Sequence, residues 1–305
     1  MGVDLKSDIS TRAAFSNAIT EFGLKDERVF TIAADSESRF GAFIKEAPTR
    51  AINVGIAEQN AMSIAAGMAF CGKVPFVSTY ATFLTMRACE QIRTDIAFAN
   101  LNVRIVGTNT GFSSDLLGFT HQALEDIGLM RALPNMTVLV PADGEETYRL
   151  VEAIINYEGP AYLRIRGTSK EPHIHSEERI EIGKARRLRA GNDLTIIACG
   201  RMVQEALKAA DQLALEGVKA RVLGVHTVKP IDQEAILEAA AETKRILTVE
   251  EHNIIGGLGS AVAEVTSEYK PIIVKRMGIK DRFGVPGKEK ELFEYFGLTS
   301  EHIVG

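Results

Sequence analysis

The sequence lacks the features that direct a protein to nucleic acid, into a membrane or out of the cell. A net charge of −5 and a pI near 5.8 give no electrostatic reason to expect nucleic acid or an anionic membrane as partner. No apolar run reaches about 18 residues, and the N-terminal segment contains no apolar signal region. Secretion and membrane insertion are therefore not expected.

Cysteine is scarce, and several catalytic motifs are missing. The three cysteines are widely spaced and form no CxxC or Cys/His cluster, so neither a zinc site nor a disulfide scaffold is expected, and a reduced, cytoplasmic setting is the default. The sequence contains no GxSxG, no HExxH and no complete GxGxxG motif. These absences argue against a serine hydrolase, a zinc peptidase and a nicotinamide-dependent enzyme.

The composition is that of a globular protein with room for two domains. Of the 305 residues, 46% are hydrophobic and 25% are charged, and the length allows two domains of about 150 residues each. Helical and strand patterns alternate through most of the chain, which predicts an α/β protein with two mostly parallel sheets flanked by helices. We expect domains at residues 1–170 and 193–305, joined by a polar linker over 171–192 that contains one or two short strands.

The expected strands and helices follow one another in a regular order. Strands are predicted at 29–33, 52–54, 75–78, 103–107, 137–140, 161–165, 194–198, 220–225, 246–249 and 272–275. Helices are predicted at 11–21, from 58 onward, and at 83–98, 144–157, 202–216, 233–243, 258–268 and 288–296. The glycine-rich residues 256–260 resemble a phosphate loop only superficially, and we interpret them as the cap of the helix that follows.

Glu58 opens a helix that is apolar on nearly every face, and such a helix is normally buried. The carboxylate therefore stands at the mouth of a core element and needs a partner. The helix N-terminus favours its anionic form, whereas removal from water favours the neutral acid. The residues alone leave two interpretations open: a first-turn acid that satisfies free backbone N–H groups, or a functional carboxyl group.

A polar loop at residues 109–122 lies between a predicted strand and the next helix. In open parallel sheets, ligands bind at the loops that leave the carboxyl ends of strands. His121 lies in this loop between Thr120 and Gln122, either as a structural histidine or as a catalytic one. Arg12 and Arg166, near the ends of elements, can face an anionic ligand or form surface ion pairs.

Two histidines in the linker carry little functional signal. His173 and His175 are two residues apart, so on a strand they would share one face. No thiolate or carboxylate cluster accompanies them, and we interpret them as solvated rather than as metal ligands.

Several separated motifs together resemble the pyrimidine-binding domain of transketolases. They are NVGIAEQN at 53–60, YATFL at 80–84, GFTHQ at 118–122, RALPNM at 131–136 and PAD at 141–143. The stretches VKPID at 228–232 and GGLG at 256–259 resemble the C-terminal domain of the same family. The resemblance covers nearly the whole chain in one order, and several motifs in register are far more specific than any one of them.

The resemblance implies thiamine diphosphate chemistry. Glu58 matches the glutamate that hydrogen-bonds N1′ of the aminopyrimidine and favours its imino tautomer, which then takes the C2 proton of the thiazolium. This role requires Glu58 to hold or share a proton near neutral pH. Phe83 matches the aromatic residue that stacks on the aminopyrimidine, and Met86 falls where a second aromatic residue often lies. Asp35 is also expected among the cofactor-binding residues.

The resemblance also implies a set of substrate-binding residues. His121 matches the histidine that contacts the donor sugar and the reaction intermediates, while Arg12 and Arg166 match two residues that hold a substrate phosphate. Ser38 also matches a residue that holds the substrate phosphate, but this match is weaker because a shift of the alignment by one residue would change it. The chain departs from the family pattern at Leu117 and Asn109, which stand where an acid and a second histidine are expected, so the donor preference is open.

A Gly-Asp-Gly motif, which holds the diphosphate and the metal in transketolases, is missing from this chain. The inference is that the chain is one subunit of a split enzyme, and that an N-terminal diphosphate-binding subunit supplies the ligands of Mg²⁺ or Ca²⁺. We expect an α2β2 heterotetramer with the cofactor between unlike chains, no metal ligands in this chain, and little or no activity of this chain alone.

The expected function is the C-terminal subunit of a two-component transketolase, which transfers a two-carbon ketol unit between ketose and aldose phosphates, as in the pentose phosphate pathway. Three alternatives stay open. The chain also resembles the E1 β subunit of a 2-oxoacid dehydrogenase, although the Thr-His-Gln triplet at 120–122 favours transketolase over the His-Ser-Gln of β subunits. A deoxyxylulose-phosphate synthase-like enzyme shares that triplet. A non-catalytic protein that binds a sugar phosphate or a partner is the alternative of another class.

Overall fold

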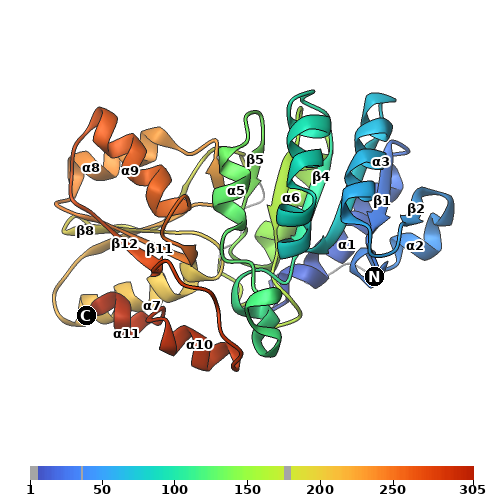
Figure 1. Cartoon of the computed structure of the whole chain (residues 1–305). Helices are drawn as coiled ribbons and strands as arrows, with labels where there is room; N and C mark the ends of the chain where they lie inside the picture. Colours follow the sequence, from blue (N-terminus) through green and yellow to red (C-terminus); the bar gives the residue numbers. More distant parts are fainter. Residues whose placement is uncertain (1–5, 36, 175–179) are drawn as a thin grey trace.

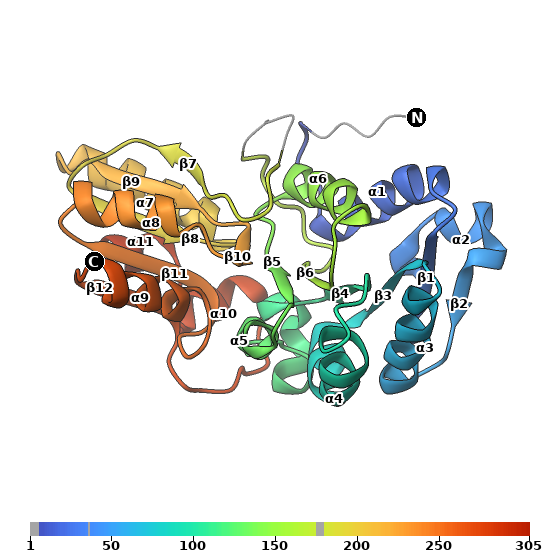
Figure 2. The same ribbon diagram turned by 90° about the horizontal axis from the view of Figure 1, so that it is seen from above.

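The computed structural model describes residues 6–35, 37–174 and 180–305. Within these residues the chain forms a seven-stranded sheet and a five-stranded sheet that lie side by side, each flanked by helices (Figures 1 and 2). The predicted fold class, an α/β protein with two mostly parallel sheets, is confirmed. None of the described helices is long and apolar enough to cross a membrane.

The larger sheet has the strand order β10-β5-β6-β4-β3-β1-β2. Its strands are β1 (Val29–Ala33), β2 (Ala51–Asn53), β3 (Val74–Tyr80), β4 (Arg104–Thr108), β5 (Thr137–Leu139), β6 (Ala161–Arg164) and β10 (Thr227–Lys229). All neighbours are parallel except β10, which pairs antiparallel with β5. Because the other six strands run in one direction, their carboxyl ends and the loops that leave them gather at one edge of the sheet.

The smaller sheet has the strand order β12-β11-β8-β9-β7. Its strands are β7 (Arg186–Arg189), β8 (Leu194–Ala198), β9 (Ala220–Gly224), β11 (Ile246–Asn253) and β12 (Val274–Ile279). The four longer strands are parallel, and β7 pairs antiparallel with β9 at the edge. Strand β7 confirms that the stretch predicted as a linker contains a short strand.

Helices cover both faces of each sheet. The α-helices of the first half are α1 (Thr11–Lys25), α2 (Phe43–Glu46), α3 (Glu58–Phe70), α4 (Cys89–Gln91), α5 (Asp126–Ala132) and α6 (Gly144–Ile155). Those of the second half are α7 (Met202–Leu215), α8 (Gln233–Glu242), α9 (Leu258–Tyr269), α10 (Glu289–Tyr295) and α11 (Ser300–Val304). Helices α1 and α6 pack on one face of the larger sheet and α3 and α4 on the other (Figure 2), while α8 and α9 face α7, α10 and α11 across the smaller sheet (Figure 1).

Local chemistry explains where several helices begin. The hydroxyl oxygen of Ser10 accepts a hydrogen bond from the backbone N–H of Ala13, which caps α1. Asp143 and Asp232 cap α6 and α8 in the same way through their carboxylate oxygens. Each cap satisfies a backbone donor that has no partner inside its helix.

The helix predicted at 83–98 is interrupted. It consists of two π-helical turns, η3 (Phe83–Arg87) and η4 (Ile92–Ala97), with the short α4 between them. Single π-helical turns are rare and occur most often at functional sites. The wider turn η3 changes the direction in which its side chains leave the backbone, directly after the carboxyl end of β3.

One hydrophobic core spans both halves of the chain. Val140 and Met130 from the first half belong to the same buried cluster as Ile197, Leu223 and Leu258 from the second. The second half also gives β10 to the larger sheet, which was not predicted. The two predicted domains are therefore joined by shared core packing and by a strand, and the predicted boundaries at 170 and 193 stay predictions.

Candidate active site

Glu58 is the first residue of α3 and is 4% exposed. Its Oε1 accepts a hydrogen bond from Nη1 of Arg87 at 3.1 Å. The turn before it contains Gly55 at φ 70°, a backbone conformation that L side chains rarely adopt. The buried carboxylate of the first residue of α3 is thus paired with the guanidinium of Arg87.

The loops that follow β1 and β2 are tied together beside Glu58. The side-chain amide of Asn53 donates to the backbone oxygen of Asp35 at 2.9 Å, and its carbonyl oxygen accepts from the N–H of Gly55 at 2.9 Å. Asp35 itself is exposed and has φ 76°. Asn53 therefore fixes the turn that presents Glu58, a role that its position in the motif did not predict.

Three rings surround the space next to Glu58. The centroid of the Phe83 ring is 5.1 Å from that of His121 and 5.6 Å from that of Tyr80, and the Tyr80 and His121 rings are 5.2 Å apart, edge to face. The guanidinium of Arg87 lies over the Phe83 ring at 3.9 Å. The structure thus brings together Glu58, Phe83 and His121, which the sequence placed 25 and 38 residues apart.

His121 is held from both its ring and its backbone. Its Nδ1 lies 2.9 Å from Oγ1 of Thr120, and its backbone oxygen accepts a hydrogen bond from the hydroxyl of Thr82 at 3.2 Å. The hydroxyl of Thr120 can donate to an unprotonated Nδ1, a tautomer that leaves Nε2 as the proton-bearing nitrogen. The threonine of the Thr-His-Gln triplet thus has a direct effect on the histidine ring.

The loop that carries His121 is anchored by the second half of the chain. This loop contains η5 (Gly111–Thr120), in which Phe112 is fully buried and stacks on Phe296 with centroids 4.9 Å apart. The backbone N–H of Phe112 donates to Oε1 of Glu251 at 2.7 Å. Nε2 of Gln122 donates to the backbone oxygen of Val285 at 3.0 Å. The second half therefore positions a residue of the site without lining the site itself.

A pair of arginines lies next to the aromatic group. Nη2 of Arg12 donates to Oγ of Ser38 at 3.1 Å, as expected if both contact one anion. Arg39 is 3% exposed, its Nε donates to Oγ1 of Thr108 at 2.9 Å, and its guanidinium lies 5.0 Å from the Tyr80 ring centroid. Burial lowers the pKa of Arg39, and the positive charge of Arg12 lowers it further. The charge of Asp35 acts on the pKa of Arg39 in the opposite direction, and phosphate binding by Arg12 and Ser38 stays a prediction.

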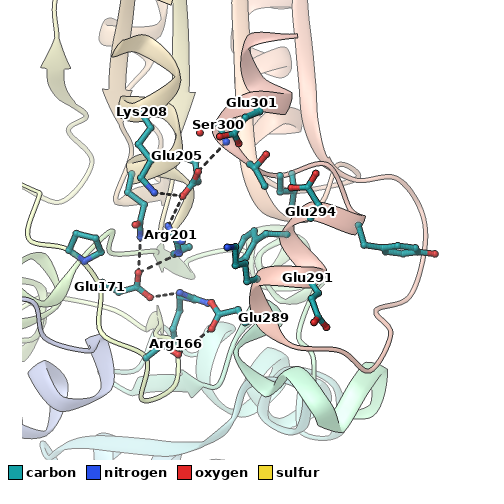
Figure 3. Close-up of a pocket in the computed structure, with 18 of the residues that line it drawn as sticks. Arg166, Glu171, Arg201, Glu205, Lys208, Glu289, Glu291, Glu294, Ser300 and Glu301 are labelled. Carbon is teal, nitrogen blue, oxygen red and sulfur yellow. Dashed lines mark hydrogen bonds and ion pairs between the residues drawn. The ribbon is translucent and has the colours of Figure 1, made fainter. Parts of the chain in front are cut away.

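Arg166 lies at a cavity of 1390 Å³ between the two halves of the chain (Figure 3), and its backbone N–H donates to Oγ1 of Thr11, the neighbour of Arg12, at 2.9 Å. Its guanidinium forms ion pairs with Glu171, Glu251 and Glu289, of which Glu289 is the most exposed at 22%. Arg201 pairs with Glu171 and Glu205 in the same cavity. The guanidinium of Arg166 is thus held by carboxylates of this chain, and its role as a substrate contact stays a prediction.

Of the remaining positions of interest, Met86 and Leu117 are exposed and Asn109 is half-buried. Met86 is 44% exposed, and Leu117, which replaces an expected acid, is 53% exposed. Asn109 has φ 57° and accepts a hydrogen bond from the hydroxyl of Ser114 at its backbone oxygen. None of the three takes part in the contacts around Glu58 that have been described, so Met86 stays a prediction as a cofactor contact.

The linker histidines and the glycine-rich stretch at 256–260 were also singled out in the sequence. His173 lies outside any strand, with Nδ1 3.6 Å from Glu145, and His175 falls outside the described residues. Within the described part of the chain, no group of three or more His, Cys, Asp or Glu side chains is arranged to hold a metal ion. The N–H groups of Leu258 and Gly259 donate to the carboxylate of Glu250, which confirms that the glycine-rich stretch caps a helix.

Comparison with protein families gives two matches in the order of the two sheets. Residues 7–169 match the family described as transketolase, pyrimidine binding domain, and residues 183–303 match transketolase, C-terminal domain. The chain belongs to the transketolase family. Glu58, Phe83 and His121 all lie in its pyrimidine-binding part, whereas Glu251 and Phe296, which anchor the His121 loop, lie in its C-terminal part.

Relatives of known description cover nearly the whole chain. It is 41% identical over 295 residues to the 6-deoxy-6-sulfo-D-fructose transketolase subunit SqwH of Clostridium sp. (strain MSTE9), covering 96% of this chain and 92% of the relative. It is 40% identical over 299 residues to an apulose-4-phosphate transketolase subunit of Phocaeicola vulgatus, covering 97% and 95%. It is 38% identical to the 1-deoxy-D-xylulose-5-phosphate synthase of Bacillus cereus (strain AH820), of which it spans 47%.

Solved structures show the same arrangement. A split-gene transketolase described as an inactive beta4 tetramer superposes with a TM-score of 0.89 and 44% identity, covering 98% of this chain and 96% of that chain. A transketolase from Pichia stipitis superposes with a TM-score of 0.83 over 98% of this chain and 45% of that chain, and at 24% identity it supports the fold alone.

Proposed function

We propose that the chain is the C-terminal subunit of a two-component transketolase and transfers a two-carbon ketol unit between sugar phosphates. The observation that carries the proposal is the buried Glu58 carboxylate, which Arg87 joins to the ring of Phe83, a ring that is in turn in contact with the imidazole of His121. The relatives named as transketolase subunits, and the split-gene transketolase of known structure, support a subunit that acts with a partner.

The residues at the site fit an aminopyrimidine ring. Such a ring needs an acid that can share a proton with a ring nitrogen and an aromatic face on which to stack, and Glu58 and Phe83 provide both next to one another. Thiamine diphosphate, when bound, supplies the electron sink for breaking and forming the carbon–carbon bond. In residues 6–35, 37–174 and 180–305, no group of three or more His, Cys, Asp or Glu side chains is arranged to hold a metal ion. We propose that an N-terminal subunit provides the diphosphate and metal ligands in an α2β2 heterotetramer.

The chain's own residues have separate roles in this proposal. Glu58 holds or shares a proton at its carboxyl group, which is shielded from water at 4% exposure. His121 contacts the donor sugar, with its ring oriented by the hydroxyl of Thr120. Arg12 and Ser38, backed by the buried Arg39, hold the anionic group of the substrate.

Arg166 is a second proposed contact to a substrate anion, but its guanidinium is already paired with carboxylates of this chain. Three carboxylates surround its guanidinium, so an anion can bind only where one of them withdraws. Glu289 is the least buried of the three, at 22% exposure, and is the first residue of the short helix α10. A substrate phosphate would take its place on Arg166.

The names of the relatives indicate which substrates to test. One relative is named for a sugar with a sulfonate and another for a sugar phosphate, so a ketose with a terminal anion is the proposed donor class. The chain should be co-expressed with an N-terminal subunit that carries the Gly-Asp-Gly motif and assayed for ketol transfer with thiamine diphosphate and Mg²⁺ or Ca²⁺.

The same assay separates the alternatives. Formation of 1-deoxy-D-xylulose 5-phosphate by the complex, without ketol transfer between sugars, would replace the proposed function by the synthase reaction to which the chain is also related. A complex that assembles and binds sugar phosphate without turnover would leave a binding role.

A further inference from the structure

Arg87 contacts both Glu58 and Phe83, the two side chains that an aminopyrimidine ring needs in the proposed function. Its Nη1 donates to Oε1 of Glu58 at 3.1 Å, and its guanidinium carbon lies 3.9 Å from the centroid of the Phe83 ring. One planar, cationic group thus bonds the carboxylate and covers the aromatic face at the same time. Neither contact was predicted: Glu58 is 29 residues from Arg87, and Phe83 is in the same π-helical turn, which the sequence predicted as α-helix.

Arg87 stacks on Phe83, whereas the neighbouring rings meet it at an angle. Tyr80 and His121 approach the Phe83 ring with centroids 5.6 and 5.1 Å away and with their planes tilted by 53° and 70°, so neither ring is stacked on it. Only Arg87, among these neighbours, lies at stacking distance. A heterocycle that bonded Glu58 and stacked on Phe83 would need the space that the Arg87 guanidinium fills.

Arg87 is also placed to leave. Its side chain is 50% exposed, whereas that of Glu58 is 5% exposed. It is the last residue of the π-helical turn η3, which begins at Phe83. A long side chain that extends from the end of such a turn can move into water by rotating its own bonds, while Phe83 and Glu58 stay fixed in their elements.

We propose that Arg87 is a displaceable internal ligand of Glu58 and Phe83, which holds both side chains in the unliganded subunit and moves into solvent when an aminopyrimidine ring takes its place. The inference rests on the proposed function and adds a positioning residue to it. Arg87 competes with the cofactor for the site and stabilises the buried carboxylate until the cofactor arrives.

The test compares Arg87→Ala with wild type in two measurements. In the complex reconstituted with the Gly-Asp-Gly subunit, calorimetric titration with thiamine diphosphate should give a Kd that is lower by about tenfold, because the fraction of sites closed by Arg87 no longer reduces the apparent affinity. In the isolated chain, thermal unfolding should show a lower Tm, because Glu58 has lost its ion-pair partner. Tighter binding combined with lower stability of the free chain is the signature of displacement.

Two further variants keep the test sharp. Arg87→Gln keeps a hydrogen-bond donor near Glu58 but not the charge, and should give intermediate values of both Kd and Tm. Arg93→Ala removes an exposed arginine from the following turn η4 and should change neither.

Each outcome decides the proposal. An unchanged or higher Kd in Arg87→Ala, with wild type binding normally, would overturn the displacement and leave the proposed function intact. If the wild-type complex bound no thiamine diphosphate at all, the proposed function would fall and this inference with it.

Discussion

At the scale of single residues, the proposed ketol transfer depends on the carboxyl group of Glu58. The variant Glu58→Gln keeps the size of the side chain but removes the acid, so turnover of the reconstituted complex should fall by orders of magnitude while assembly is unchanged. Steady-state kinetics and gel filtration measure the two properties. Glu27→Gln, at an exposed position far from the site in sequence, is the matched control and should behave as wild type. Unchanged turnover in Glu58→Gln would remove this residue from the mechanism.

The ion pair between Arg166 and Glu289 gives a second prediction for a single residue. Glu289→Gln should lower the KM for a phosphorylated substrate several-fold, because Arg166 would keep Glu171 and Glu251 but lose the carboxylate that competes with the substrate. Burial raises the pKa of Glu289, but the charge and the hydrogen bonds of its neighbours, Arg166 above all, together lower it more. The net shift of this pKa is downward, so the competing group is charged at neutral pH.

Glu294→Gln, on the same helix and largely exposed, is the control for this variant. A KM that rises in Glu289→Gln would indicate that Glu289 orients Arg166 instead of blocking it. An unphosphorylated, uncharged substrate analogue should show the same KM in both variants and in wild type.

At the scale of elements, the π-helical turn η3 and the loop with η5 bring the site together. Periodicity predicted most helices and strands, because the spacing of apolar residues is set within each element. The pattern at 83–98 predicted one continuous helix, and the two π-helical turns leave no trace in the spacing of apolar residues. Because the sequence predicted an ordinary helix here, it did not predict where the side chain of Arg87 lies.

The anchor of the His121 loop predicts a loss of both stability and rate. Phe112→Ala should reduce the free energy of unfolding by about 3–5 kcal/mol, since a fully buried ring that stacks on Phe296 would be lost. Its turnover should fall as well, because the loop that carries His121 is less well fixed. Urea unfolding of the isolated chain and kinetics of the complex measure the two effects. A stable but slow Phe112→Leu variant would strengthen the argument, and an active Phe112→Ala variant would contradict it.

The cap of α9 predicts a pH dependence of stability. Burial raises the pKa of Glu250 from 4.5 to about 7 in the folded chain. Between these two values the folded state binds more protons than the unfolded state, so the free energy of unfolding contributed by Glu250 falls as pH rises from 4.5 to 7 and stays low above it. The pKa of Glu146 is raised in the same direction, also to about 7.

Glu250→Gln should therefore narrow the difference in unfolding free energy between pH 5 and pH 8, although it cannot accept both N–H groups of the cap at once. The measurement is urea unfolding at the two pH values. Glu268→Gln, at an exposed position of α9, the helix whose N–H groups donate to Glu250, should retain the wild-type difference. An equal pH dependence in Glu250→Gln would mean that its pKa is the same in the folded and unfolded chain.

At the scale of the whole molecule, the sequence predicted the order of elements better than the contacts between halves. The repeated alternation of strand and helix was enough for two mostly parallel sheets, and the motifs placed Glu58, Phe83 and His121 in one site. Strand β10 was missed because its three residues, Thr227–Lys229, are too few to show a period and pair with a strand about 90 residues away. Arg39 and Arg87 were missed because their partners are distant in the sequence.

The shared core has a consequence for the role of the second half. Because Phe296, Val285 and Glu251 hold the loop of His121, the second half positions the site even though none of these residues lies next to Glu58 in the described contacts. The two halves of the chain share one hydrophobic core. Among the residues that the structure describes, no group of three or more His, Cys, Asp or Glu side chains is arranged to hold a metal ion. In the proposed function, the diphosphate and metal ligands come from a second polypeptide.

The most direct test of this account is a titration of activity. A fixed amount of the Gly-Asp-Gly subunit is mixed with increasing amounts of this chain, and ketol transfer is measured at saturating thiamine diphosphate and metal. The account predicts no turnover from either chain alone and a rate that rises to a plateau at one chain per partner. Full turnover by this chain alone, or no rise in rate on mixing, would contradict it.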